Sequence, residues 1–255
     1  IISSTGMDRY NVKVSADTKL TNNWSSGFTA NYITTSIDKA VTSGNGLLRT
    51  VYAAPPSYDL AGIPSHVDGN QYTQNSFRGS FDNAYWAMDN NKFTEDTNRF
   101  FGNVYASYQT DFGTTNHKLN AKYMVGVDAY TTHYVDSYGY GSNTGGGRGQ
   151  IENYGWTNAT YNSLLTINYD WHINEDWGLN AVLGNEIIQS NRKKYYEYGT
   201  NYNFPGWNHI NNATTQQTEE ETWKNRTVGF FGNVSASYRN MLYLTLTGRQ
   251  DYVSN

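Results

Sequence analysis

The chain has 255 residues and no cysteine, and its 18 basic side chains nearly balance its 22 acidic ones. The lack of cysteine excludes disulfides, thiolate metal sites and cysteine nucleophiles, and the balanced charge excludes the basic surface of a dedicated nucleic-acid-binding protein. With 23 Tyr, 7 Trp, 10 Phe and 24 Gly but only 4 Pro, the composition favours strands and turns over helices.

The first predicted strands lie near the beginning of the chain. Apolar side chains occupy every second position from Tyr10 to Ala16 and again from Trp24 to Tyr32, and residues 17–23 form a polar stretch between the two runs. A period of two places successive side chains on opposite faces of a strand. The pattern therefore predicts an antiparallel hairpin with one apolar face.

A repeated phrase shows the same alternation further along the chain. FFGNVYASY begins at Phe100, and FFGNVSASY begins at Phe230. In both copies one face carries Phe, Gly, Val, Ala and Tyr, whereas the other is mostly polar. Each copy leads through a short turn into a second alternating run, at 119–129 and at 242–246, and the runs 159–169 and 179–183 form another pair. About eight strands are predicted.

The connections between these strands are unequal. Those near 17–23, 111–117, 170–177 and 239–240 are short, whereas those at about 33–98, 131–157 and 189–226 are long. No apolar run approaches the roughly 18 residues of a membrane helix, but a transmembrane barrel strand needs an apolar residue only at every second position. The sequence thus predicts an all-β, antiparallel, up-and-down transmembrane β-barrel with short periplasmic turns and long extracellular loops. A soluble β-sandwich is the alternative.

The alternation also predicts which side chains face lipid and which face the lumen. Those expected to face lipid are Val104, Ala106, Leu242, Leu244 and Leu246. Those expected to face the lumen are Asn103, Ser107, Lys122, Ser235, Thr245 and Thr247. Aromatic residues gather beside the short turns, at Trp24, Tyr108, Phe112, Trp171 and Trp177. Amphipathic rings in such positions suit the level of lipid headgroups.

Two passages resemble those of SusC/RagA-like TonB-dependent outer-membrane transporters. DNAYWAMDNNKFTEDTNRFFGNVYASY, from Asp82, is similar to the family passage that begins DNPYW, and FFGNVSASYRNMLYLTLTGRQDYVSN is similar to a later barrel segment. The likeness runs from about residue 8 to the last residue, with departures at Ala84, where the family usually has Pro, and at Gln250 and Tyr252. It implies a barrel of the 22-stranded class, a plug domain, a periplasmic energy-coupling segment and a SusD-like surface lipoprotein that covers the barrel.

On this resemblance, residues 1–255 are part of the barrel domain, about eight strands from its middle, and the plug is absent from this chain. The expected location is the outer membrane of a Gram-negative bacterium. The expected function is TonB-energised import of an oligosaccharide or a peptide, and a passive porin or an adhesin-type barrel is the alternative. Closure of the eight strands into a narrow barrel is the alternative architecture, but the small polar side chains predicted to face inward favour a wide lumen.

Catalytic motifs are not found in the sequence. The five histidines have no HExxH spacing, the glycine-rich stretch 140–150 lacks the GK[ST] of a phosphate-binding loop, and no Ser/His/Asp arrangement is evident. We therefore expect no enzyme activity, no cofactor and no metal centre. Calcium in the outer loops stays an open alternative, because Asp82, Asp89, Glu95 and Asp96 lie close together in sequence.

Aromatic residues concentrate in two of the predicted long loops. The candidate contacts for a ligand or a protein partner are Tyr134, Tyr138, Tyr154, Trp156, Tyr202 and Trp207. Aromatic faces beside Asn and Asp side chains can stack on sugar rings or insert into a partner protein. Packing within the loops themselves is the alternative role.

Overall fold

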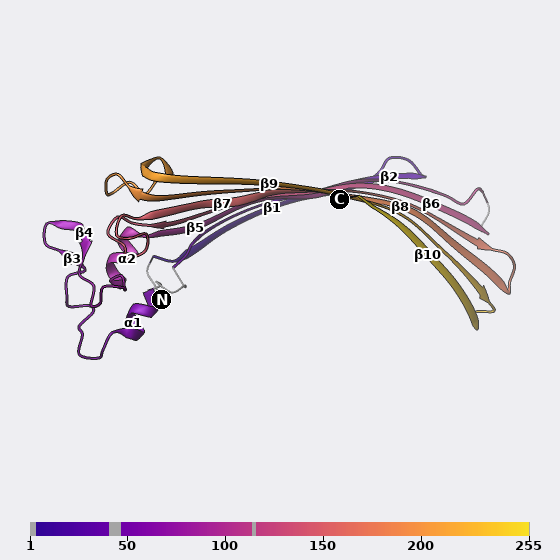
Figure 1. Ribbon diagram of the computed structural model, residues 1–255. Coiled ribbons are helices and arrows are strands. Elements are labelled where there is room, and N and C mark those ends of the chain that lie inside the picture. Colours follow the sequence, from indigo (N-terminus) through magenta and orange to yellow (C-terminus); the bar gives the residue numbers. More distant parts are fainter. Residues whose placement is uncertain (1–3, 41–46, 114–115, 255) are drawn as a thin grey trace.

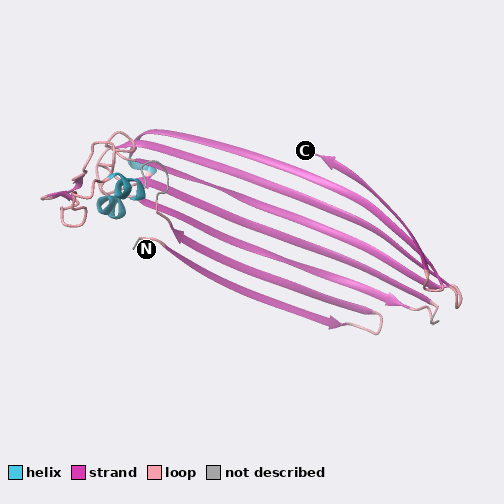
Figure 2. Ribbon diagram, turned by 90° about the horizontal axis from the view of Figure 1, so that it is seen from below, coloured by secondary structure: helices cyan, strands magenta, loops and turns pink. Residues whose placement is uncertain are grey.

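The computed structural model describes residues 4–40, 47–113 and 116–254. An antiparallel eight-stranded sheet dominates it, in the order β1-β2-β5-β6-β7-β8-β9-β10. The strands are β1 (Gly6–Lys19), β2 (Trp24–Asp38), β5 (Lys92–Thr110), β6 (His117–Tyr138), β7 (Gln150–His172), β8 (Trp177–Tyr202), β9 (Ala213–Tyr238) and β10 (Leu242–Ser254). Figure 2 shows them side by side in chain order. The predicted all-β, up-and-down architecture is confirmed.

The connections fall at opposite ends of the sheet according to their length (Figure 1). The turn end carries the connections 20–23, 111–116, 173–176 and 239–241. In the last of these, Arg239 and Asn240 have φ values of 48° and 55°, the positive values that the two central residues of a type I′ turn adopt, and the Met241 backbone N–H donates to the Tyr238 carbonyl at 3.0 Å. The predicted asymmetry of short and long connections is therefore confirmed. Of the predicted turn 111–117, residues 114–115 lie outside the described residues.

The other end, here called the loop end, carries the small elements (Figure 1). They are the helices α1 (Leu47–Ala53) and α2 (Ala84–Asn90), the two-stranded sheet of β3 (His66–Val67) and β4 (Asn70–Gln74), and the 3₁₀ turn η1 (Ile210–Asn212). Residues 41–46 of the first long connection lie outside the described residues. Among the described helices, none has the length and the apolar character that crossing a membrane requires.

The long connections are shorter than the sequence predicts. They span 39–91, 139–149 and 203–212, whereas the predicted loops were about 33–98, 131–157 and 189–226. The residues in between belong to strands, which reach up to 26 residues in β8 and β9. Beyond Thr34, Asn98 and Arg226 both strand faces are largely polar, so the period-two signal disappears while the backbone hydrogen bonds continue.

The eight strands do not close on themselves. Among the described residues β1 and β10 form the two edges of the sheet and pair only with β2 and β9. The alternative of a narrow eight-stranded barrel is therefore wrong. A narrow barrel must fill its interior with side chains, whereas the face that would turn inward bears charged groups such as Lys122, Asp128 and Glu186, which need water or a partner.

One face of the sheet carries an apolar belt next to the turn end. The strand register places Val104 of β5 on the same face as Phe28 of β2 and Val125 of β6, and we call this the outward face. Large apolar side chains exposed on it are Tyr10, Val12, Phe28, Tyr32, Phe100, Val104, Val125, Leu165, Ile167, Leu183, Phe230, Val234, Leu244 and Leu246. On β9 the belt runs from Tyr238 to Val228, which spans about 25 Å at the usual rise and tilt of barrel strands.

Aromatic pairs mark the edge of this belt at the turn end. Trp24 packs on Tyr108 with ring centroids 5.0 Å apart, and Trp177 packs on Tyr238 at 4.8 Å. Each pair is a directly opposed cross-strand pair on the outward face. These positions are where the sequence predicted a row of aromatic residues.

The opposite, inward face is polar and hollowed. A hollow of about 710 Å³ opens there, lined by residues that include Lys13, Asn31, Asn103, Thr160 and Asn162. The register places the predicted lumen-facing residues on this face; they are Asn103, Ser107, Lys122, Ser235, Thr245 and Thr247. That the face lines a lumen stays a prediction.

We expect Leu246→Arg to destabilise the full-length protein in a bilayer by about 2 to 4 kcal/mol, because Leu246 lies opposite Val234 near the middle of the apolar belt. Thr247→Arg is the matched control, since its side chain lies on the inward face and should cost less than about 1 kcal/mol. Denaturant titration of both variants in lipid vesicles measures the difference. Equal losses would contradict the assignment of the outward face to lipid.

Candidate functional site

An aromatic wall lines the inward face near the loop end. We give this name to the rings of Tyr134 on β6, Tyr154 and Trp156 on β7, Tyr196 on β8 and Trp223 on β9. All five are inward-facing positions of adjacent strands. They lie beyond the level of the apolar belt, where the sheet has no apolar outward face. The wall is therefore a separate feature of the extended strands.

The rings on β6 and β7 form the most regular part of the wall. Tyr134 stacks on Tyr154 with centroids 4.8 Å apart and planes 6° from parallel, and it also contacts Trp156 at 5.6 Å. The ammonium of Lys39, just after β2, lies 4.5 Å from the Tyr134 ring centre. A cation at this distance from a ring face is attracted by the ring quadrupole. When Tyr196, 6.4 Å from Tyr154, is included, the cluster draws on three adjacent strands and on Lys39, the residue after β2.

Arg192 continues the wall towards β9. Its guanidinium carbon lies 5.2 Å from the Trp156 ring centre and 5.4 Å from that of Trp223. The arginine therefore lies between two indoles that the register places two strands apart. Such a contact holds the planar guanidinium against apolar ring faces while its N–H groups can still donate hydrogen bonds.

Burial and neighbouring carboxylates raise the pKa of two tyrosines of the wall. The Tyr154 hydroxyl donates to Asp136 Oδ2 at 3.0 Å. Burial, and then the negative charge of Asp136, raise the pKa of Tyr154 above its ordinary value. Burial and the neighbouring Glu152 likewise raise the pKa of Tyr196 to about 12. The wall therefore presents neutral phenol donors, indole faces and carboxylate acceptors together.

A buried carboxylate ties the loop-end segments to one another. Asp82 is only 3% exposed. Its Oδ1 accepts hydrogen bonds from Gln74 Nε2 at 2.8 Å and from the Asn143 backbone N–H at 2.7 Å, and its Oδ2 accepts from Ser142 Oγ at 2.6 Å. We call these four residues the Asp82 cluster. Because Ser142 and Asn143 belong to the connection 139–149, the cluster joins two of the three long connections.

The residues that follow Asp82 form the start of α2. Asn83 is the N-cap, and its side-chain oxygen accepts from the backbone N–H groups of Tyr85 and Trp86, which is the usual role of asparagine at this position. Ala84 is the first helical residue, a position that also suits proline, so its departure from the family pattern leaves the helix start intact. Trp86 is 1% exposed and donates from Nε1 to the Gln71 carbonyl at 2.8 Å.

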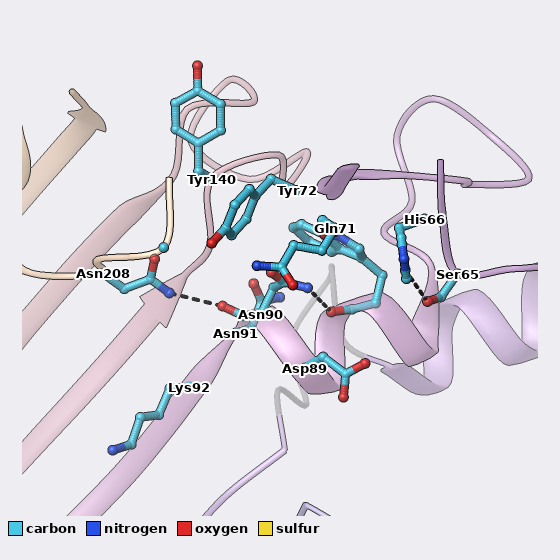
Figure 3. A pocket seen from close by; sticks show the side chains of 12 residues that line it. Ser65, His66, Gln71, Tyr72, Asp89, Asn90, Asn91, Lys92, Tyr140 and Asn208 are labelled. Carbon is cyan, nitrogen blue, oxygen red and sulfur yellow. Dashed lines mark hydrogen bonds between the residues drawn. The ribbon is translucent and has the colours of Figure 1, made fainter. Parts of the chain in front are cut away.

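A polar cavity of about 460 Å³ lies at the loop end (Figure 3). Its lining comes from β3 and β4, from α2 and the start of β5, and from both other long connections; it includes Ser65, His66, Gln71, Tyr72, Asn90, Lys92, Tyr140 and Asn208. Asn208 Nδ2 donates to the Asn90 carbonyl at 2.9 Å (Figure 3). Gly141, with φ of 101°, and Gly206, with φ of 85°, approach Tyr72 so closely that a Cβ would collide with it, so both positions favour glycine.

The structure separates the six predicted contact residues into three groups. Tyr134, Tyr154 and Trp156 belong to the aromatic wall. Tyr202 is completely buried beside Ile151 and Ala213, and Tyr138 packs edge-on against Phe93 at 5.2 Å, so both support the loop end by packing. Trp207 is 44% exposed and lies in a stacked row with Phe204 and His209. What any of them binds stays a prediction.

Sequence reasoning missed the charged partners of the wall and the role of Asp82. Lys39 and Arg192 belong to no recognisable sequence motif. Only the pairing of the strands places each cation beside its aromatic ring. The inward position of Arg192 and Trp223 could have been found by continuing the period-two count of β8 and β9 beyond the belt. The contacts of Asp82 join residues up to 61 positions apart, and no local pattern signals them.

The acidic residues considered for calcium are engaged separately. Glu95 pairs with Lys39 at 3.7 Å, Asp96 accepts from Ser36 Oγ at 2.6 Å, and Asp82 is held in its cluster. Within the part of the chain that the structure describes, no three His, Asp or Glu side chains gather as a metal site requires. Calcium binding is a prediction without structural support at these positions.

Solved structures similar to this chain include those of a peptide importer. The RagAB peptide importer in the open-open state matches with a TM-score of 0.76 at 14% identity, covering 98% of this chain and 28% of that chain. The RagAB peptide transporter matches at 0.76 and 13% identity, and the importer in the closed-closed state at 0.74 and 14%, with the same coverage. The fold is that of a RagA-like barrel segment. This chain spans 28% of the length of these RagAB chains.

The match to RagAB is structural. No protein-family model matches the sequence, and no curated protein matches it either. At 14% identity the likeness to RagAB establishes the arrangement of strands, whereas it leaves the chemistry of the inward face to be argued from the residues of this chain.

Proposed function

We propose that this chain is a segment of the wall of an outer-membrane nutrient importer of the TonB-dependent, SusC-like type. The proposal rests on how the polarity of the two strand faces changes along the strands. Next to the turn end they have an apolar outward face and a polar, hollowed inward face, and beyond the belt they continue as a polar structure with aromatic rings inside. The similarity to the RagAB peptide importer supports transport rather than catalysis.

The proposed location is the outer membrane of a Gram-negative bacterium, with the belt in lipid and the loop end outside the cell. The loop end also carries exposed apolar side chains on α1 and on the connection 203–212; they are Leu48, Val51, Tyr52, Phe204 and Trp207. Exposed apolar and aromatic groups of this kind suit a protein partner. A SusD-like surface lipoprotein is the partner that we propose, and TonB would act through other parts of the full-length protein.

The proposed cargo is an oligosaccharide or a peptide, and the aromatic wall is the proposed contact surface. Ring faces stack on sugar rings or on apolar side chains, and the phenols and carboxylates beside them can bond either hydroxyl or amide groups. The wall lies on the inward face, along the route from the loop end to the hollow. Trp207 lies at the exposed rim instead, where a partner contact is the better assignment.

Deleting the energy-coupling protein tests the proposal. In cells that carry the full-length protein as the sole route for a cargo, uptake should stop when TonB is deleted, because a plugged barrel needs energy to open. Radiolabelled cargo in intact cells is the readout. Continued uptake at the normal rate would favour the passive porin, and normal surface display with no uptake of any nutrient would favour the adhesin.

A further inference from the structure

A group of cations lies on the outward face of β8 and β9, directly beyond the apolar belt. On β9 the last apolar outward residue is Val228, and Arg226 and Lys224 are the next two outward residues towards the loop end. On β8 the corresponding positions after Ile187 are Gln189, Asn191 and Lys193. We call Lys193, Lys224 and Arg226 the basic patch. All three are exposed.

The patch is held in place by its own strands. The guanidinium of Arg226 donates through Nε to Gln189 Oε1 at 3.0 Å, and its Nη2 donates to the same oxygen. Lys193 pairs with Glu220 at 2.9 Å, and Lys224 makes no ion pair with any residue that the structure describes. One carboxylate therefore faces three cations, and the patch keeps an excess of positive charge.

The rest of the outward face at this level has the opposite charge. Over β1, β2 and β5 the outward residues beyond the belt include Asp8, Asp38 and Asp96. Asp96 accepts from Ser36, and the basic residue at an outward position of these strands beyond the belt is Lys92, which lies four residues further towards the loop end than Asp96. Next to the belt, the positive charge is thus confined to β8 and β9 and is not a general property of the belt edge.

Two of the three cations, Arg226 and Lys224, lie near the height of a layer of lipid headgroups, whereas Lys193, six residues beyond Ile187 on β8, lies roughly 14 Å from the belt. At the rise and tilt of barrel strands, Arg226 and Lys224 lie roughly 5 and 9 Å beyond Val228, and the headgroup region is about 5 to 7 Å thick on each side of the hydrocarbon. Long basic side chains extend several ångströms along a surface to reach such a layer. Binding of a soluble anion does not require a site at the edge of the apolar belt.

We propose that the basic patch binds the phosphate-bearing headgroup of an anionic lipid in the outer leaflet. The inference rests on the proposed membrane location and goes beyond transport, because it assigns a lipid contact to one side of the wall. The acyl chains of the bound lipid would lie along the belt residues below the patch, including Val228 and Phe230. The acidic side over β1, β2 and β5 would repel the same headgroup.

The test compares two double variants of the full-length protein that each remove two positive charges. Lys224→Gln/Arg226→Gln changes the patch, and Lys118→Gln/Lys122→Gln changes two inward-facing lysines of β6 as the matched control. Native mass spectrometry in detergent measures binding of phosphatidylglycerol and of phosphatidylcholine. We expect the patch variant to lose about thirty-fold in affinity for phosphatidylglycerol, since each of the two basic residues near an anionic surface contributes about fivefold, with phosphatidylcholine unchanged.

Two outcomes would overturn the inference. An equal loss in the inward-facing control would show a general charge effect, and displacement of phosphatidylglycerol by millimolar inorganic phosphate would show a site for soluble anions. Cargo uptake measured on the same variants separates this inference from the proposed function. Normal cargo uptake by a protein without lipid preference would contradict only the lipid site. A wild-type protein that does not enter the membrane would contradict both the lipid site and the proposed function.

Discussion

Asp82→Ala should open the loop end and raise trypsin cleavage after Arg148 by about two orders of magnitude. The substitution removes the acceptor of the Gln74, Ser142 and Asn143 hydrogen bonds. A buried donor without an acceptor costs about 1 to 3 kcal/mol, and about 3 kcal/mol in total corresponds to a hundredfold larger open population. Arg148 lies in the same connection, where its carbonyl accepts from the Tyr202 backbone N–H at 2.9 Å.

The rate of cleavage follows the open population when reclosing is fast. Timed proteolysis of the folded full-length protein in detergent micelles, where trypsin reaches both ends of the strands, measures it by mass spectrometry. Cleavage after Lys19, at the turn end, is the internal reference and should not change. Asp89→Ala removes an exposed carboxylate from α2, the helix that follows Asp82, and should leave Arg148 protected. Cleavage after Arg148 at the wild-type rate in Asp82→Ala would show that the cluster does not hold the connection.

The chain expressed alone should not form a stable monomeric barrel in a bilayer. Its edge strands, β1 and β10, leave one row of backbone N–H and C=O groups each without a strand partner. In hydrocarbon every such group costs several kcal/mol. Several groups per edge lie at the level of the belt, so the total penalty is on the order of tens of kcal/mol and exceeds the stability of ordinary domains.

Refolding of residues 1–255 into vesicles, followed by electrophoresis with and without heating, tests this expectation. We expect aggregates or oligomers that pair their open edges, and no heat-modifiable monomer. The full-length protein refolded in parallel is the positive control. A protease-resistant monomer from the isolated chain would mean that β1 and β10 can pair with each other.

The sequence was sufficient to predict the strands within the belt, because lipid and water impose opposite demands on alternate residues there. Val104 and Asn103 differ in polarity for this reason, as do Leu244 and Thr245. The turn at Arg239 and Asn240 was also predictable, since it is short and interrupts two clear runs. The same alternation located the aromatic pairs at the turn end.

The strands beyond the belt could not be predicted in this way. Between 189 and 202 both faces of β8 meet polar surroundings, so no hydrophobic period distinguishes strand from loop, and pairing with β7 and β9 decides the structure. The passage that begins at Asp82 was recognisable from its sequence. The role of Asp82, however, depends on Ser142 and Asn143, which are distant in sequence. Of the site, the rings of β6 and β7 were predicted, whereas their register and their cationic neighbours were not.

The extension of the strands sets how far the aromatic wall stands from the charges of the membrane. Counted from Ile187, the last belt residue of β8, Arg192 and Tyr196 lie roughly 12 and 21 Å further out at the usual strand rise and tilt. The headgroup layer extends about 5 to 7 Å beyond the belt, and the Debye length at physiological ionic strength is about 8 Å, so the field of anionic headgroups still reaches Arg192 but is largely screened at Tyr196. Selection of ligands by charge at the level of Tyr196 and beyond would therefore depend on the groups of the wall and its neighbours, such as Lys39, Asp136 and Glu152, and should be insensitive to the lipid composition of the bilayer.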